Sequence, residues 1–154
     1  YTPEESSKGL FLLYSSLLFS FLLLCYYIPR FSKNISDAVK LLRWGAPLNL
    51  IVLVVIILLG SKAGAIHWAI FGISSIFLSL TQPAVGMAFP LNNAGKALTS
   101  FNLLLFVGAF VLQWLIDLGM NINISEENSF KIAMTFVLLT SFFSYLFFLF
   151  KSKN

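Results

Sequence analysis

Charged side chains are scarce in this chain: only 10% of its 154 residues are Lys, Arg, Asp or Glu. A soluble domain usually carries about a quarter charged residues, so a surface this poor in charge cannot face water throughout. Hydrophobic residues make up 58% of the chain, 17 residues are phenylalanine, and the mean hydropathy is +0.89. The composition excludes a soluble globular protein and indicates an integral membrane protein.

Residues that could support catalysis are also few. The only histidine is His67 and the only cysteine is Cys25, which cannot assemble a metal site or an intrachain disulfide. The apolar stretches hold no paired carboxylates, and no glycine-rich phosphate loop follows a predicted strand. The basic residues cluster in the 30–43 loop and in the tail, where lipid headgroups rather than nucleic acid would meet them. We therefore expect no enzyme, no metal, no cofactor and no nucleic-acid partner.

Five apolar stretches organise the chain. They span residues 10–28, 44–60, 66–88, 97–118 and 130–150. About 20 residues of helix are needed to cross roughly 30 Å of hydrocarbon, and most of these stretches are close to that length. The second is the shortest unless its helix begins back near Leu41. Strands of an outer-membrane barrel would alternate, whereas residues 50–59 are apolar without interruption. The sequence predicts an all-α bundle of five transmembrane helices in a single membrane domain.

The basic residues predict the orientation of these helices. When the connections are assigned alternately to two sides, one side receives seven basic residues, namely Arg30, Lys33, Lys40, Arg43, Lys96, Lys151 and Lys153. The other side receives Lys8, Lys62 and Lys131. Because cytoplasmic loops carry the excess of Lys and Arg, we expect an N-terminal end outside and a cytoplasmic C-terminus, in the inner (plasma) membrane.

Polar residues gather on one face of three of the predicted helices. On the fourth, a helical projection of about 100° per residue brings together Thr99, Asn102, Phe106, Ala109, Gln113 and Asp117. The stripe on the third contains Trp68, Gly72, Ser75, Ser79, Gln82 and Gly86, and that on the first contains Gly9, Ser16, Ser20 and Tyr27. The second helix has little beyond Asn49, and the fifth has scattered Ser and Thr. We expect helices one, three and four to turn these faces toward each other or a cavity, and helices two and five to face lipid.

A second interpretation of the stripes stays open. Small polar residues at helical spacing often serve only close packing between membrane helices. This reading suits Ser16, Ser20, Ser75 and Ser79 well. Asn102, Gln82 and Gln113 are larger and costlier to hide, so they favour a cavity or pathway.

Residues 80–119 resemble a known family. The segments are Leu-Thr-Gln-Pro-Ala-Val-Gly-Met-Ala-Phe-Pro at 80–90, Asn-Ala-Gly-Lys-Ala-Leu-Thr-Ser-Phe-Asn at 93–102, Phe-Val-Gly-Ala-Phe at 106–110 and Gln-Trp-Leu-Ile-Asp-Leu-Gly at 113–119. They are similar to the junction of the tenth and eleventh helices in many bacterial permeases of the major facilitator superfamily. Lys96 stands where that family has Arg, and the 28–34 loop lacks the glycines and the aspartate of the family's loop motif.

The resemblance implies that the chain is the C-terminal half of a secondary transporter, corresponding to helices eight to twelve. Its partners would be the N-terminal half, the lipid bilayer and a small polar solute moved by alternating access. The candidate pathway residues are Ser20, Ser79, Gln82, Asn102, Phe106 and Gln113, with Pro83, Pro90, Gly95 and Lys96 as hinge or loop positions. The alternative is a non-transporting membrane scaffold or assembly subunit whose stripes merely pack.

Overall fold

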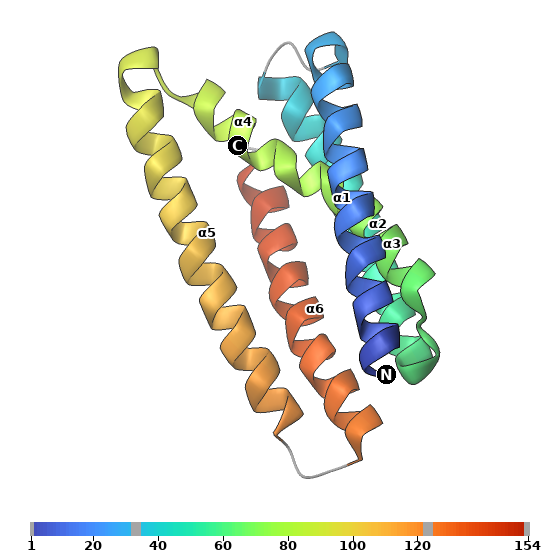
Figure 1. Ribbon diagram of the computed structural model, residues 1–154. Coiled ribbons are helices and arrows are strands. Elements are labelled where there is room, and N and C mark those ends of the chain that lie inside the picture. The colour runs from blue at the N-terminus through green and yellow to red at the C-terminus, as the bar shows by residue number, and fades with distance from the viewer. Residues whose placement is uncertain (1, 32–34, 122–124, 153–154) are drawn as a thin grey trace.

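Helices account for all regular structure in the computed structural model, which describes residues 2–31, 35–121 and 125–152 (Figure 1). The elements are α1 (Pro3–Phe31), α2 (Ile35–Leu59), η1 (Gly60–Lys62), α3 (Ala65–Ser74), η2 (Ser75–Leu80), α4 (Thr81–Ala88), α5 (Leu91–Met120) and α6 (Glu126–Lys151), where η marks a 3₁₀ helix. Five stretches in the described residues are long and apolar enough to cross a membrane: Pro3–Tyr27, Asp37–Lys62, Ala65–Ala88, Leu91–Met120 and Glu127–Lys151. The predicted five-span, all-α fold of a multi-pass membrane protein is confirmed.

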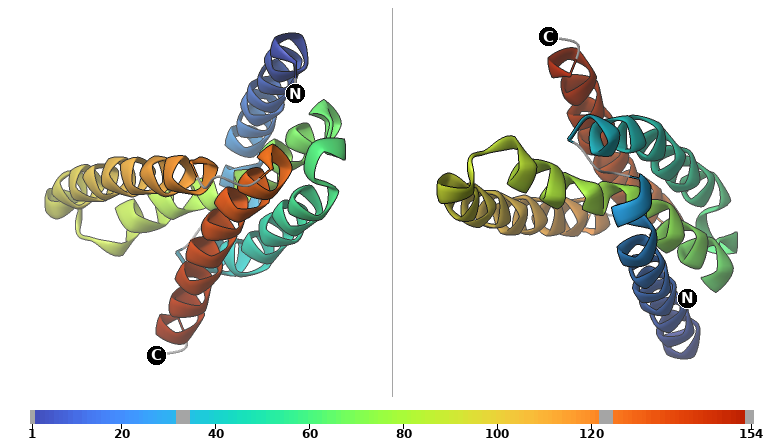
Figure 2. Two further views of the ribbon diagram at one scale, coloured as in Figure 1. Left: turned by 90° about the horizontal axis from the view of Figure 1, so that it is seen from below. Right: turned by 90° about the horizontal axis from the view of Figure 1, so that it is seen from above.

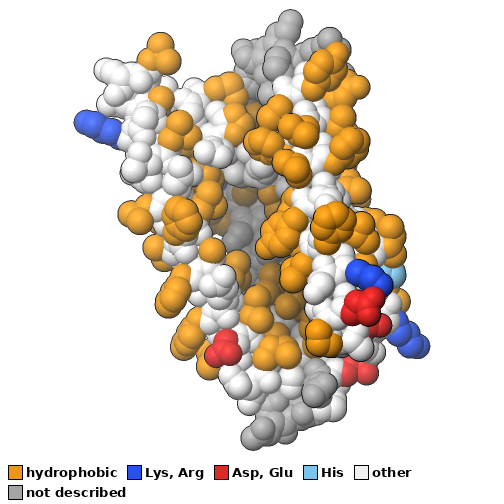
Figure 3. Space-filling view, viewed as in Figure 1, with side chains coloured by type: hydrophobic (Ala, Val, Ile, Leu, Met, Phe, Trp, Pro, Cys, Tyr) orange, Lys and Arg blue, Asp and Glu red, His pale blue; other side chains and the backbone are white. Residues whose placement is uncertain are grey.

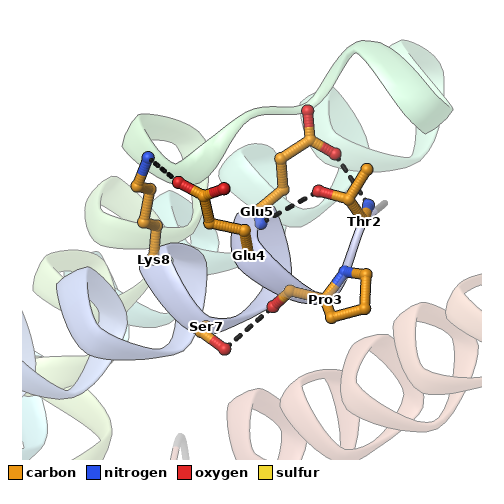
Figure 4. A network of polar contacts seen from close by, with 6 residues as sticks. All are labelled: Thr2, Pro3, Glu4, Glu5, Ser7 and Lys8. Carbon is orange, nitrogen blue, oxygen red and sulfur yellow. Dashed lines mark hydrogen bonds and ion pairs between the residues drawn. The ribbon is translucent and has the colours of Figure 1, made fainter.

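The helices begin earlier than the apolar stretches suggested, because polar first turns also adopt helix. In α1, Thr2 and Glu5 form a reciprocal cap: the Thr2 backbone N–H donates to Glu5 Oε2 at 2.8 Å, and the Glu5 N–H donates to Thr2 Oγ1 at 3.2 Å (Figure 4). Pro3 follows at the first helical position, where its missing N–H costs nothing. Lys8 pairs with Glu4 at 2.7 Å one turn later. These contacts extend α1 well before residue 10.

The second span starts at Ile35 and not near residue 44, so Pro47 lies in its interior. Proline cannot donate a hydrogen bond to the carbonyl four residues before it, which here belongs to Arg43. The Tyr145 hydroxyl of α6 donates to that carbonyl at 2.9 Å. A side chain from another helix therefore replaces the backbone hydrogen bond that Pro47 removes.

The second span, α2, is the most buried of the five spans. It packs against α3, η2, α4 and α6. In its most hydrophobic stretch of 18 residues, 33% of the residues are buried, against 6% in the corresponding stretches of α1, α5 and α6. Gly45 allows α2 to approach η2 closely, because a Cβ atom at this position would collide with the Cβ of Phe77. The prediction that this helix faces lipid is wrong for one of its faces, where Asn49, Leu53 and Ile56 are buried, whereas Trp44, Ile51 and Leu58 on the other face are exposed. A helix that is apolar all round suits a protein interior as well as lipid, so its composition could not distinguish the two.

The outer helices pair locally. α1 packs along α3, with Gly72 so close that an added Cβ would lie 2.5 Å from Ser16 Oγ. α5 packs along α6, where a Cβ at Gly119 would lie 2.7 Å from the Cα of Ala133. In both end views of Figure 2, α1 and α5 project in different directions. The predicted stripes of helices one and three therefore meet, whereas the stripe of α5 does not join them.

The third span runs obliquely and is not a uniform α-helix. It passes from α3, beside α1, to α4, which reaches the first turns of α5 (Figure 1). Its middle, Ser75–Leu80, is a 3₁₀ helix that ends three residues before Pro83. The ring of Pro83 crowds the carbonyl of Ser79 and removes one hydrogen bond, which is a recognised cause of such a break. α4 ends at Ala88, and the next residue, Phe89, adopts extended backbone angles as residues before a proline usually do.

The charged side chains lie toward the ends of the spans. On the face seen in Figure 3, hydrophobic side chains cover the middle band and the charged ones lie near its two limits. The N-terminus and the C-terminus lie at opposite ends of the bundle, as an odd number of spans requires (Figure 1). Lys33, Lys153 and the side chain of Arg30 lie outside the described residues. Which end faces the cytoplasm stays a prediction.

Candidate functional site

A cluster of polar side chains joins α2 to the third span inside the bundle. Asn49 is 7% exposed, and its Nδ2 donates to Ser74 Oγ at 2.9 Å, to Ser75 Oγ at 2.8 Å and to the Phe71 carbonyl at 3.4 Å. The hydroxyls of Ser74 and Ser75 in turn donate to the Phe71 carbonyl, each at 2.8 Å. A buried amide is costly unless it is hydrogen-bonded, and the Nδ2 group of this one is well satisfied. The cluster clamps α2 to the point where α3 becomes η2.

A cavity of about 580 Å³ lies beside this cluster, between α2, the η2–α4 segment, α5 and α6. Its described lining is mostly apolar, and its polar members are Asn49, Thr81, Thr140, Ser141, Ser144 and Tyr145. The α6 members follow the spacing i, i+1, i+4 and i+5, which places them on one helix face. From the sequence, the Ser and Thr residues of this fifth span were predicted to be scattered and to share no face. The spacing was the signal that could have identified the face.

The three candidate pathway residues outside α5 occupy different environments. Ser20 is buried on α1 with 6% exposure. Ser79 is half-buried in η2, where its hydroxyl donates to the Ile76 carbonyl at 2.6 Å, and Gln82 is exposed on α4. Ser16, which lies one turn before Ser20 in the α1 stripe, donates to the Ala69 carbonyl of α3 at 3.1 Å, and this hydrogen bond is a packing contact between the two helices. Ser20, Ser79 and Gln82 are not among the described residues that line the 580 Å³ cavity.

The candidates on α5 lie together on a face that the rest of the described chain leaves largely uncovered. Gln113 is exposed, Phe106 is 75% exposed and Asn102 is half-buried. Residues two apart on a helix stand about 160° apart, so Gln113 lies nearly opposite Leu115, which lines the cavity. In the same way, Asp117 lies nearly opposite Gly119, the point of contact with α6. The stripe therefore turns away from α6 and from the cavity, so the prediction that it faces helices one and three or a cavity is wrong for the described residues.

No family model, curated protein or solved structure matches the chain. The major facilitator resemblance of residues 80–119 therefore stays a prediction. The roles of the six candidate pathway residues also stay predictions.

The hinge and loop candidates divide between two elements. Pro83 is the third residue of α4 and is exposed, and Pro90 precedes the first residue of α5. Gly95 and Lys96 are not in a loop, as the sequence suggested, but in the second turn of α5. The helix begins earlier because the Pro90 carbonyl accepts hydrogen bonds from the Asn93 and Ala94 amides at 2.8 and 2.9 Å. Lys96 is exposed there.

A second cavity, of about 730 Å³, opens at the end of the bundle where α1 begins. Its lining combines charged residues with the aromatic side chains of Trp68 and Phe130. His67 is half-buried nearby, and its Nδ1 lies 3.3 Å from the Gly64 carbonyl. Within the described residues, no group of three His, Cys, Asp or Glu side chains could hold a metal ion.

Proposed function

We propose that this chain is part of a secondary transporter that moves a small polar solute by alternating access. The observation that carries this proposal is the uncovered polar stripe of α5, which includes Asn102, Gln113 and Asp117. Asn102 and Gln113 both lie within the 30-residue span Leu91–Met120. An amide that faces hydrocarbon without a partner costs several kcal/mol. The stripe therefore needs water, a solute or another polypeptide beside it.

The resemblance of residues 80–119 to the major facilitator superfamily supplies the identity of that partner. In this reading the N-terminal half of the transporter covers the α5 face, and the solute passes between the two halves. The complete reading frame is then expected to add about seven helices, which would give two six-helix halves. The protein would lie in the inner (plasma) membrane, with its C-terminus in the cytoplasm.

The third span provides a place to flex during such a cycle. α3 is held by α1 and by the Asn49 clamp, whereas α4 packs against α5. Between them lie the 3₁₀ segment Ser75–Leu80 and Pro83, where the regular hydrogen bonds of the helix are interrupted. A small change of backbone angles there would move α4 and α5 relative to α1 and α3.

Thiol accessibility tests the pathway. In a Cys25→Ser background, Asn102→Cys and Gln113→Cys are each introduced into the full reading frame, with Leu115→Cys as the control on the opposite face of α5. A membrane-impermeant maleimide should modify the two stripe positions and leave residue 115 unmodified. Protection of all three positions would contradict a water-filled pathway.

Transport itself separates the carrier from the scaffold. Asn102→Ala and Gln113→Ala should lower uptake or efflux, screened over a panel of radiolabelled neutral solutes, about tenfold or more while the protein level is unchanged. As a control, Asn93→Ala removes the same side-chain amide from a position of α5 that lies outside the stripe, and it should leave transport unchanged. A loss of abundance alone would favour the scaffold, a reading that the packing contact of Ser16 with Ala69 supports on α1.

A further inference from the structure

The cavity between α2, α4, α5 and α6 has hydrogen-bonding groups left over after the helices are assembled. Within the described residues, the hydroxyls of Ser141 and Ser144 make no hydrogen bond, although they line this space. By contrast, their neighbours Thr140 and Tyr145 donate to the carbonyls of Phe136 and Arg43 at 2.9 Å each. The wall of α6 therefore presents two unengaged hydroxyls to the cavity.

The opposite wall presents an acceptor. Asn49 lines the cavity, and all of its hydrogen bonds to described residues are made by Nδ2. Its carbonyl oxygen Oδ1 thus has no donor among these residues. An amide oxygen on α2 and two hydroxyls on α6 can together bind a group that both donates and accepts a hydrogen bond.

The remainder of the cavity is apolar and uncharged. Its described lining includes no Lys, Arg, Asp, Glu or His, and the other walls are formed by side chains such as Leu50, Leu78 and Leu112. An ion would find no counter-charge in such a site. The volume of about 580 Å³ falls within the range of about 300–1,000 Å³ typical of small-molecule sites.

We propose that this cavity binds an uncharged amphipathic small molecule, with its hydroxyl or amide group between Asn49 and the Ser141–Ser144 pair and its apolar body against α5. The site is separate from the α5 stripe and does not depend on the transporter assignment. A lipid acyl chain would fill the apolar part but would leave the three polar groups without partners. The polar lining therefore favours the amphipathic ligand.

The cavity also touches the segment proposed to flex. Leu78 of η2 and Thr81 of α4 form part of its wall, on either side of the junction between the two elements. A bound molecule would contact both sides of this junction and also α5. Occupancy of the site is therefore expected to favour the bend seen in the third span.

Photolabelling tests the site in the full-length protein in lipid nanodiscs. The probes are a medium-chain alkanol carrying a diazirine, the matching alkane diazirine and the matching carboxylic acid diazirine, with labelled residues mapped by mass spectrometry. The alkanol should label α5 and α6 residues around the cavity saturably, about fivefold more than either control probe, as one or two hydrogen bonds would give. Equal labelling by the alkane would identify an acyl-chain groove and overturn the proposal.

Two variants and one control locate the ligand. Gly108 lines the cavity and has no atom within 4 Å of an added Cβ, so Gly108→Leu should fill the space without disturbing the fold and should abolish alkanol labelling. Gly95 is equally open but lies outside the lining, so Gly95→Leu should leave labelling unchanged. The double variant Ser141→Ala/Ser144→Ala should weaken saturation by about fivefold or more. Labelling that survives the filled cavity, or saturation that is unchanged by the loss of both hydroxyls, would overturn the proposal.

Discussion

At the scale of single residues, hydrogen bonds between helices satisfy groups that the sequence of each helix alone leaves unpaired. Asn49 is the only large polar residue in the middle of α2, and it finds two serines and a carbonyl on the third span. The Arg43 carbonyl, freed by Pro47, finds Tyr145. Both contacts join α2 to neighbours that are distant in sequence, so neither could be predicted from local pattern.

The pair formed by Pro47 and Tyr145 gives a prediction at this scale. Tyr145→Phe should destabilise the protein by about 0.5–1.5 kcal/mol, because it leaves the Arg43 carbonyl without its donor. In a Pro47→Ala background the same change should cost less, since the backbone N–H that alanine restores at this position can donate to that carbonyl. Denaturation in mixed micelles of the four proteins of this double-mutant cycle measures the difference. Equal costs in both backgrounds would mean that the hydroxyl does not replace the missing backbone hydrogen bond.

At the scale of elements, the sequence located the helices better than it located their neighbours. All five spans were found, but α2 and α5 begin about a turn and a half to two and a half turns earlier than predicted, because polar residues such as those of 35–43 and 91–96 also form helix. The polar residues of α5 do share one face, but the prediction that this face meets helices one and three or a cavity is wrong for the described residues. The hydroxyl face of α6 was missed, because serine and threonine are common in membrane helices and their number alone does not indicate a polar face. Only their helical spacing does.

The contact between α5 and α6 gives a prediction at this scale. Gly119→Val places a side chain where its Cβ would lie 2.7 Å from the Cα of Ala133, so it should separate the helices and cost about 1–3 kcal/mol. Gly95→Val lies on the same helix in open space and should cost only a small fraction of that. Thermal unfolding in detergent measures both. Similar melting temperatures for the two variants would show that the close approach at Gly119 contributes little.

At the scale of the whole molecule, composition determined the class and periodicity determined the number of spans, but neither determined the arrangement. The driving force between membrane helices comes from packing and not from burial of apolar surface, so the most buried helix need not be the most amphipathic. Here it is held by Gly45 and Asn49, two residues in an otherwise uniform apolar run. The candidate site was predicted in part for the same reason: the α5 stripe was visible, and the cavity between four helices was not.

Orientation gives the prediction at this scale. A fluorescent protein that matures only in the cytoplasm should be bright when fused after Asn154, because seven basic residues lie on that side against three on the other. Inserting the same reporter in the turn that contains Ser61 should give a dark protein. The reverse pattern would invert the predicted topology.

The placement of the two termini at opposite ends of the bundle has a consequence for gene fusions. If two copies of this five-span unit were joined head to tail by a short linker, the second would have to enter the bilayer upside down relative to the first. Tandem duplication would thus generate an antiparallel pair, and a same-way-up dimer would require an extra crossing between the copies.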